Sequence, residues 1–295
     1  MRALLHIVLA LALLPAASFA RCADYEPQPK PQNAGRDEVG QDLESILEQG
    51  WIEFAAYEDF PPYSYEEAGQ PVGVDIDIGR VVAAALGVEA RFKLVAAGEN
   101  LEADLRNYLW KGPVVGGRVS NVMLRVPYDS EFSCRVEQVV FTGQYSTERI
   151  AIAYSESVYP DDKPVPAYFR FDTVAVENDS IADFYLTSLA GGQLRDNIRR
   201  YPSTAGAMAA LADGEVKAAM GPRAQLEAGL TDGLALHEPP LPGFSVGSWT
   251  VGLGVNFRFR PLAYAVDDAV MAALQDGTIA GIYAAHGLTH ELPER

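Results

Sequence analysis

Short apolar strands alternate with amphipathic helices along the chain from Leu43 onward. The segment WIEFAAY (51–57) alternates with period two, as a half-buried strand does, and VDIDIGRVVAAALG (74–87) has helical spacing that stops at a glycine. A second strand, EARFKLVAA (89–97), and a second helix, LEADLRNYLWKG (101–112), follow. Because parallel strands need crossover connections, this alternation predicts an α/β fold with mainly parallel sheets flanked by helices.

A second block of strands and helices begins after Tyr154. We expect strands at 172–179 and 215–221 and helices at 180–191, 204–214 and 222–230. A closing strand at 249–258 and two helices at 260–277 and 278–288 complete the pattern. Two α/β blocks favour a protein with two lobes, and ligands of such proteins bind between the lobes or at the carboxyl ends of strands.

The first 36 residues differ in character from the rest. Residues 1–20 have a short basic start, an apolar run and small residues before Arg21, which predicts a cleaved secretory signal peptide. Residues 21–36 are polar and rich in proline, as a flexible leader is. We therefore expect export through the inner membrane and a location in the periplasm, with no membrane-spanning segment in the mature chain.

Charge and chemistry narrow the function further. The chain has 23 basic and 40 acidic residues, a net charge of −17, which argues against nucleic acid as a partner. The four histidines and two cysteines lack metal-ligand spacing, so we expect no metal and no other cofactor. An exported protein can form a disulfide between Cys22 and Cys134, and the sequence leaves that pairing open.

Four segments together resemble the bacterial extracellular solute-binding proteins of family 3, the periplasmic substrate-binding components of amino-acid-type ABC importers. They are a strand, an aromatic-proline loop and a helix start in 50–87, CRVEQVVFTGQY in 134–145, MAALADGEVKAAMG in 208–221, and the closing helices in 266–287. LRNYLWKG (105–112), followed by an extended VMLRVPYD (122–129), is also similar to the branch of relatives that accompany quinoprotein dehydrogenases.

The resemblance implies a two-lobe, Venus-flytrap fold (type II) that closes over a small-molecule solute. Lobe 1 would be discontinuous, formed by 37–146 plus 250–288, lobe 2 would be 147–249, and 289–295 would be a C-terminal tail. The protein would act as a monomer and deliver its solute to an inner-membrane permease complex.

The resemblance also implies ligand-binding residues. Arg135 matches the family arginine that holds the carboxylate of a bound amino acid through a bidentate pair. Phe60 and Tyr63 match the aromatic residues that cover the ligand. Each has a structural alternative, since the arginine can tie a lobe together and the aromatic residues can pack within their loop.

Four further residues are candidates on weaker grounds. Arg125 and Tyr128 stand where the family has compact donors to the carboxylate, and Asp179 and Ser180 begin a helix whose N–H groups can hold an anion.

Two residues depart from the family pattern at the position of the ligand's ammonium group. Lys217 and Pro222 replace the acidic residues expected there, and neither can pair a buried ammonium. We therefore expect a small, carboxylate-bearing solute that is not an ordinary α-amino acid.

Two alternatives remain open. The first is a non-transport accessory protein of a periplasmic quinoprotein (PQQ) alcohol or methanol dehydrogenase, with the dehydrogenase or its cytochrome as partner. The second is a dehydratase-like enzyme on the same fold, with Glu177 or Asp179 as general acid. Because the sequence has no nucleophile–base motif and no catalytic histidine or cysteine arrangement, we expect no enzymatic activity and no catalytic residue.

Overall fold

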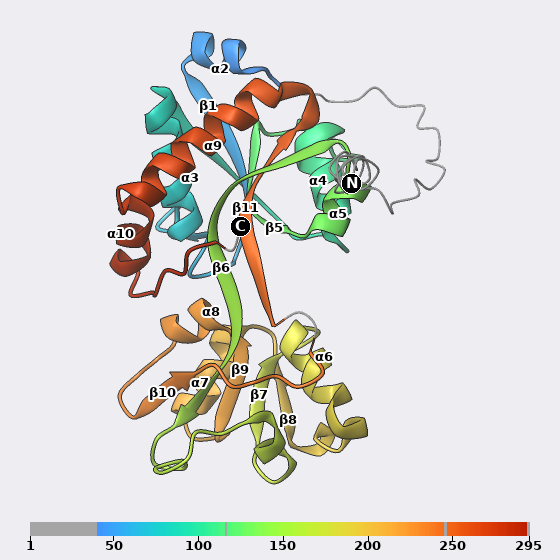
Figure 1. Ribbon diagram of the computed structural model, residues 1–295, viewed down its shortest axis with the longest axis vertical. Helices are drawn as coiled ribbons and strands as arrows, with labels where there is room; N and C mark the ends of the chain where they lie inside the picture. Colours follow the sequence, from blue (N-terminus) through green and yellow to red (C-terminus); the bar gives the residue numbers. More distant parts are fainter. Residues whose placement is uncertain (1–39, 116, 245–246, 294–295) are drawn as a thin grey trace, which may run out of the picture.

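The computed structural model describes residues 40–293 apart from residue 116 and residues 245–246, and it has two lobes joined by extended strands (Figure 1). The predicted signal peptide and leader lie outside the described residues. In Figure 1 the lobe above contains the first strands and the last two helices, and the lobe below contains β7 to β10.

One mixed sheet of nine strands runs through both lobes. Its order is β4-β1-β5-β11-β6-β9-β7-β8, and β10 also pairs with β6. Pairing is parallel for β1 with β4 and β5, and for β7 with β8 and β9, while β6 and β11 pair antiparallel with their neighbours. The strands are β1 (Trp51–Tyr57), β4 (Glu89–Val95), β5 (Val122–Tyr128), β6 (Val139–Ser155), β7 (Val174–Glu177), β8 (Ile198–Tyr201), β9 (Ala218–Pro222), β10 (Leu234–His237) and β11 (Ser248–Asn256). The predicted α/β fold class is confirmed.

The strand β6 connects the two lobes. Its first part, from Val139 to Arg149, pairs with β11, and its second part, from Ile150 to Tyr154, pairs with β9. Since β11 also pairs with β5, these two long strands carry the hydrogen-bonded sheet from one lobe into the other (Figure 1).

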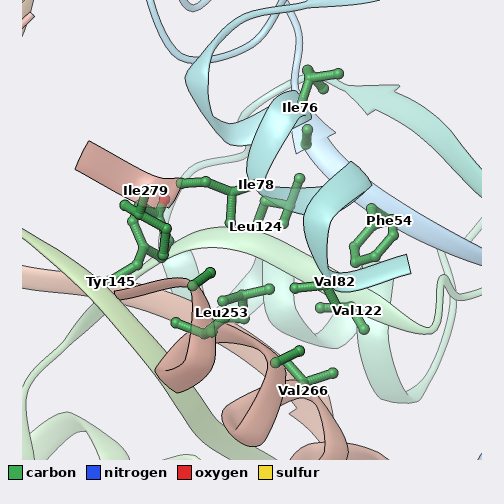
Figure 2. Close-up of a cluster of buried hydrophobic side chains, with 14 of the residues drawn as sticks. Phe54, Ile76, Ile78, Val82, Val122, Leu124, Tyr145, Leu253, Val266 and Ile279 are labelled. Atoms are coloured by element: carbon green, nitrogen blue, oxygen red, sulfur yellow. The ribbon is translucent and has the colours of Figure 1, made fainter. Parts of the chain in front are cut away.

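Helices from both ends of the chain form the core of lobe 1. Helix α3 (Val74–Leu86) packs beside α9 (Arg260–Gln275) and α10 (Thr278–Ala285), and α2 (Leu43–Gln49) lies at β1. Figure 2 shows Ile78 and Val82 of α3 meeting Leu253, Val266 and Ile279 from the second half of the chain. This core therefore draws on residues before and after lobe 2, although the predicted lobe boundaries themselves stay a prediction.

Lobe 2 has a separate core on each face of its sheet. On one face α6 (Ile181–Ser188) covers Ile152, Val174 and Met220 with Leu186. On the other face α7 (Thr204–Ala212) and α8 (Arg223–Ala228) pack against alanines of β6, β7 and β9. Short helical turns complete the lobes: η2 (Pro166–Arg170), η3 (Leu189–Gly192), η4 (Arg195–Asn197) and η5 (Phe257–Phe259).

Three local features differ from the sequence pattern. The predicted helix 101–112 is α4 (Leu101–Leu105) followed by a π-helical turn, η1 (Arg106–Trp110). A short helix, α5 (Ser130–Arg135), begins at the capping carboxylate of Asp129, where no helix is expected. A small hairpin, β2 (Tyr65–Glu67) with β3 (Gln70–Val72), lies within the proline-rich loop.

Gly73 joins that loop to helix α3 in a conformation that suits glycine alone. Its φ is +120°, and a Cβ there would lie 2.3 Å from the main-chain oxygen of Tyr63. We expect Gly73→Ala to lower the free energy of unfolding by about 2 kcal/mol or more, measured by urea denaturation. Gly69→Ala is the matched control, because Gly69 has φ +76° and open space around it. Equal losses in the two variants would contradict the role assigned to the close approach at Tyr63.

Candidate functional site

A cavity of about 570 Å³ opens between the two lobes. Lobe 1 contributes the carboxyl end of β1, the loop after it, the start of α4 and part of β5, while β7, α6 and β9 of lobe 2 contribute one residue each. The lining residues are Tyr57, Glu58, Asp59, Phe60, Tyr63, Ala97, Gly98, Asn100, Leu101, Asp104, Arg125, Pro127, Glu177, Ile181, Pro222, Trp249 and Val251. Such a position, between lobes and at strand ends, is where α/β proteins hold ligands.

Aromatic side chains form one wall of the cavity. The ring of Phe60 lies 6.3 Å from the ring of Tyr57 at a right angle, and 5.1 Å from the ring of Tyr63. Trp249 of β11 lines the cavity too and packs against the cores of both lobes. The structure therefore places both predicted aromatic candidates, Phe60 and Tyr63, at the cavity.

A buried charged cluster surrounds Arg125, which lines the cavity. Arg125 is 7% exposed, and its Nη2 lies 2.7 Å from Oε2 of Glu148, while its Nη1 lies 3.5 Å from Oδ1 of Asp75. The guanidinium stacks over the ring of Tyr63, whose hydroxyl donates to Glu148, and the hydroxyl of Tyr145 donates to Asp75 over 2.7 Å. Two carboxylates thus surround one guanidinium.

Two atoms of this cluster have no hydrogen-bond partner. They are Nη1 of Arg125 and Oδ2 of Asp75, both fully enclosed. Arg125 also has a φ of +52°, the left-handed region that arginine seldom adopts. Backbone strain and unpaired polar atoms gather at functional sites, so we interpret this cluster as part of the site as well as part of the core.

Burial changes the protonation of the cluster. Burial raises the pKa of Asp75 above its ordinary value of 3.8, and the nearby Arg125 and the hydrogen bond from Tyr145 offset only part of that effect. Because one guanidinium cannot neutralise two carboxylates, the raised pKa of Asp75 fits the second negative charge on Glu148.

This raised pKa predicts a pH dependence of stability. A carboxyl group that binds its proton more tightly in the folded state favours folding below its ordinary pKa, and that contribution is lost as the pH rises through the raised value. Compared with wild type, Asp75→Asn should therefore become less destabilising between roughly pH 4 and pH 7. Urea denaturation of both proteins across this range measures the difference. A difference that grows with pH would contradict the raised pKa.

Four carboxylates line the cavity in addition to this cluster. Asp104 is buried and accepts hydrogen bonds from the Tyr57 hydroxyl at 2.8 Å and the Gly98 amide at 2.9 Å. Glu177, from lobe 2, accepts from the amide and the hydroxyl of Thr204 through one oxygen, Oε2. Glu58 and Asp59 are exposed at the rim.

The structure places Arg135 away from the cavity. It is the last residue of α5, it is exposed, and its guanidinium lies 5.5 Å from the ring centre of Phe132. Tyr128, at the end of β5, does not line the cavity either, and its ring lies 6.4 Å from that of Phe141. Of the two predicted arginines, the structure brings Arg125 to the cavity.

Amide groups at the start of α6 already donate hydrogen bonds to side chains of the same segment. The Ser180 hydroxyl accepts from the amide of Asp183 at 3.2 Å, and the Asp179 amide donates to the Asp183 carboxylate at 3.2 Å. Neither Asp179 nor Ser180 lines the cavity, although the adjacent residues Glu177 and Ile181 do.

Lys217 and Pro222, the two residues that depart from the family pattern, lie in different places. Lys217 is exposed and pairs with Asp172 within lobe 2, whereas Pro222 lines the cavity. Sequence reasoning missed Glu148 and Trp249 as site residues. Glu148 stands among Ser146, Thr147 and Arg149 in the middle of β6, so no local signal distinguished it.

Comparisons with known proteins agree with this architecture. The sequence profile of the bacterial extracellular solute-binding proteins, family 3, matches residues 52–108. An ancestral cationic amino-acid solute-binding protein superimposes with a TM-score of 0.68 at 18% identity, covering 82% of this chain and 98% of that one. The chain has the fold of a family 3 solute-binding protein. The predicted resemblance to family 3 is thereby confirmed, and the likeness to the branch that accompanies quinoprotein dehydrogenases stays a prediction.

Two further proteins share this solute-binding fold. The unliganded, open L-cystine solute receptor of Neisseria gonorrhoeae gives a TM-score of 0.63 at 16% identity, covering 86% of this chain and 100% of that one. An amino-acid ABC transporter substrate-binding protein from Streptococcus pneumoniae, bound to L-arginine, gives 0.60 at 18% identity, covering 85% and 100%. No curated protein matches the chain by sequence.

Three further expectations from the sequence concern membrane-spanning helices, metal sites and the disulfide. Within 40–293, with the gaps given above, no helix is long and apolar enough to cross a membrane. The same residues contain no group of three histidine, cysteine or acidic side chains placed to hold a metal ion. Cys134 is in a disulfide, and the other cysteine of the chain, Cys22, lies outside the described residues.

Proposed function

We propose that the protein is a periplasmic solute-binding protein that captures a small solute between its lobes and delivers it to an ABC importer. The observation that carries this proposal is the cavity lined by residues of both lobes beside the connecting strands β6 and β11. Lobes joined by two strands can close by hinge motion, and a solute contacted by both lobes stabilises the closed form. The solute-binding neighbours support the same role.

The structure changes how a solute would be held. The sequence predicts that Arg135 holds a solute carboxylate, but the arginine that lines the cavity is Arg125. The aromatic loop with Phe60 supplies the cover that the family resemblance implies.

Thermal unfolding of the mature chain against a panel of small solutes tests the proposal. The panel contains amino acids, organic acids, amines and amino alcohols, each added singly. A solute present at 100 times its dissociation constant should stabilise the protein by roughly 2.7 kcal/mol, which appears as a raised melting temperature. Phe60→Ala should abolish the shift, whereas Phe171→Ala, which alters an exposed ring on lobe 2, should retain it.

Two results would contradict the proposal. A shift that Phe60→Ala leaves unchanged would place the solute outside this cavity. A panel with no shift at all would favour the accessory role beside a quinoprotein dehydrogenase, which remains a hypothesis. An enzyme would instead convert the solute, and chromatography of the panel mixtures after incubation would reveal the product.

A further inference from the structure

The position for a solute anion is already occupied by the protein's own carboxylates. Among the described residues that line the cavity, Arg125 is the one basic side chain. Its charge is matched by Glu148 at 2.7 Å and by Asp75 at 3.5 Å, both less than 6% exposed. A solute carboxylate placed beside Arg125 would be a third negative charge around one positive charge in a buried site, which is unfavourable.

The rest of the lining is negative and comes from both lobes. Asp59 and Glu58 are exposed at the rim on lobe 1, and Glu177 lines the cavity from lobe 2. Asp104 adds a further carboxylate to the lining, and it accepts a hydrogen bond from the Tyr57 hydroxyl. With the charge of Arg125 already compensated, the cavity as a whole has an excess of negative charge, and such an excess attracts cations.

Aromatic faces in the same cavity favour the same sign of charge. Tyr57, Phe60 and Trp249 line the cavity, and the faces of aromatic rings attract ammonium and guanidinium groups. Carboxylates and aromatic faces together form a setting for an organic cation.

One unpaired donor restricts the cation further. Nη1 of Arg125 belongs to a side chain that is more than nine-tenths buried, lines the cavity, and has no hydrogen-bond acceptor for this nitrogen. The guanidinium is therefore satisfied in charge but not in hydrogen bonding. Nη1 is enclosed in this structure, so a neutral oxygen of the solute can accept from it only after the side chains around it shift on binding, and it then adds no negative charge.

We infer that the solute of this site is a small organic cation that has a neutral oxygen and no carboxylate, an amino alcohol in chemical class. The inference rests on the proposed function, since it names the kind of solute that the cleft captures. In this account Glu148 is a specificity residue, because its carboxylate takes the place beside Arg125 that a solute carboxylate would need.

Isothermal titration calorimetry with matched compounds tests the inference. Choline and ethanolamine are the probes, and glycine betaine and glycine are their counterparts with a carboxylate in place of the CH₂OH group. 3,3-Dimethylbutan-1-ol is the neutral counterpart of choline. We expect at least one of the two probes to bind, with affinity about tenfold or more above that of its carboxylate counterpart, a difference of roughly 1.4 kcal/mol. If choline is the binding probe, the neutral alcohol should be weaker by a similar factor.

Substitutions test which residues cause the preference for a cationic probe. Asp59→Asn and Glu177→Gln should each weaken binding of the cationic probe several-fold, whereas Asp232→Asn, an exposed change in a turn of lobe 2, should leave it unchanged. Glu148→Gln frees the charge of Arg125 and should shift the preference at least tenfold toward the carboxylate counterpart. If Glu148→Gln does not fold, the Asp59 and Glu177 variants still decide the question.

The outcomes separate this inference from the proposed function. Equal or tighter binding of glycine betaine or glycine overturns the inference and leaves solute binding intact. The same holds if neither probe binds while another solute of the thermal panel does. If no solute of any class binds, the inference and the proposed function are both wrong.

Discussion

Replacing Arg125 with methionine should lower the free energy of unfolding by about 3–5 kcal/mol. The change removes the one cation of a buried cluster and leaves Glu148 and Asp75 together without a compensating charge. Two buried carboxylates without a compensating charge lower the free energy of unfolding by far more than the hydrophobic contacts of a methionine raise it. Urea or thermal denaturation at pH 7 measures the loss.

Arg135→Met is the matched control for this prediction. Arg135 is exposed at the end of α5, so its replacement should change stability by no more than about 0.5 kcal/mol. The triple variant Asp75→Asn, Arg125→Met, Glu148→Gln removes all three charges and should regain part of the loss. Equal stabilities of the two single arginine variants would refute the assignment of Arg125 as the centre of the cluster.

Ending the chain at Leu288 should destabilise the protein by about 3 kcal/mol, because the tail beyond it fastens lobe 1 to the connecting strand and to lobe 2. The main-chain oxygen of Glu291 accepts from the amide of Thr147 at 3.1 Å, and the oxygen of Leu292 accepts from the Thr147 hydroxyl at 3.0 Å. The carboxylate of Glu291 pairs with Arg149 of β6 at 2.6 Å and with Arg223 of α8. Figure 1 shows this tail passing from α10 to the side of β6.

The same deletion should loosen the hinge. Amides of β6 near Thr147 lose their tail partners, so their hydrogen exchange should become faster than in the full chain. A chain that ends at Leu292 keeps the bonds named above and should match the full chain in stability and exchange. Full stability of the chain that ends at Leu288 would show that the tail contributes nothing to the hinge.

Local signals in the sequence predicted most of the elements. Gly87 ends α3, as the glycine at the end of the helical spacing predicts, and it does so in the left-handed conformation, while Ser180 caps α6 at the predicted helix start. The length of β6 was not predictable in this way. Its 17 residues depend on pairing with β11 in one half and β9 in the other, which are contacts distant in sequence.

The candidate site also depends on contacts that local sequence signals do not predict. The spacing of Arg135 from the following strand matches the family pattern, but Asp129 caps an added helix, α5, that holds this arginine on the surface. Asp75 lies in the first turn of α3, where a carboxylate commonly complements the helix dipole, and only the fold shows its contacts with Arg125 and Tyr145. Pairing among buried charges is set by tertiary packing, so sequence spacing could not distinguish the two arginines.

Hydrogen–deuterium exchange with and without the solute identified by the thermal panel tests the central claim most directly. If the solute binds between the lobes, it should slow amide exchange in residues 57–64 of lobe 1 and in residues 177–183 of lobe 2 in the same experiment. Protection confined to one lobe, or to the separate groove of lobe 2 at residues 165–171 and 189–194, would contradict capture between the lobes.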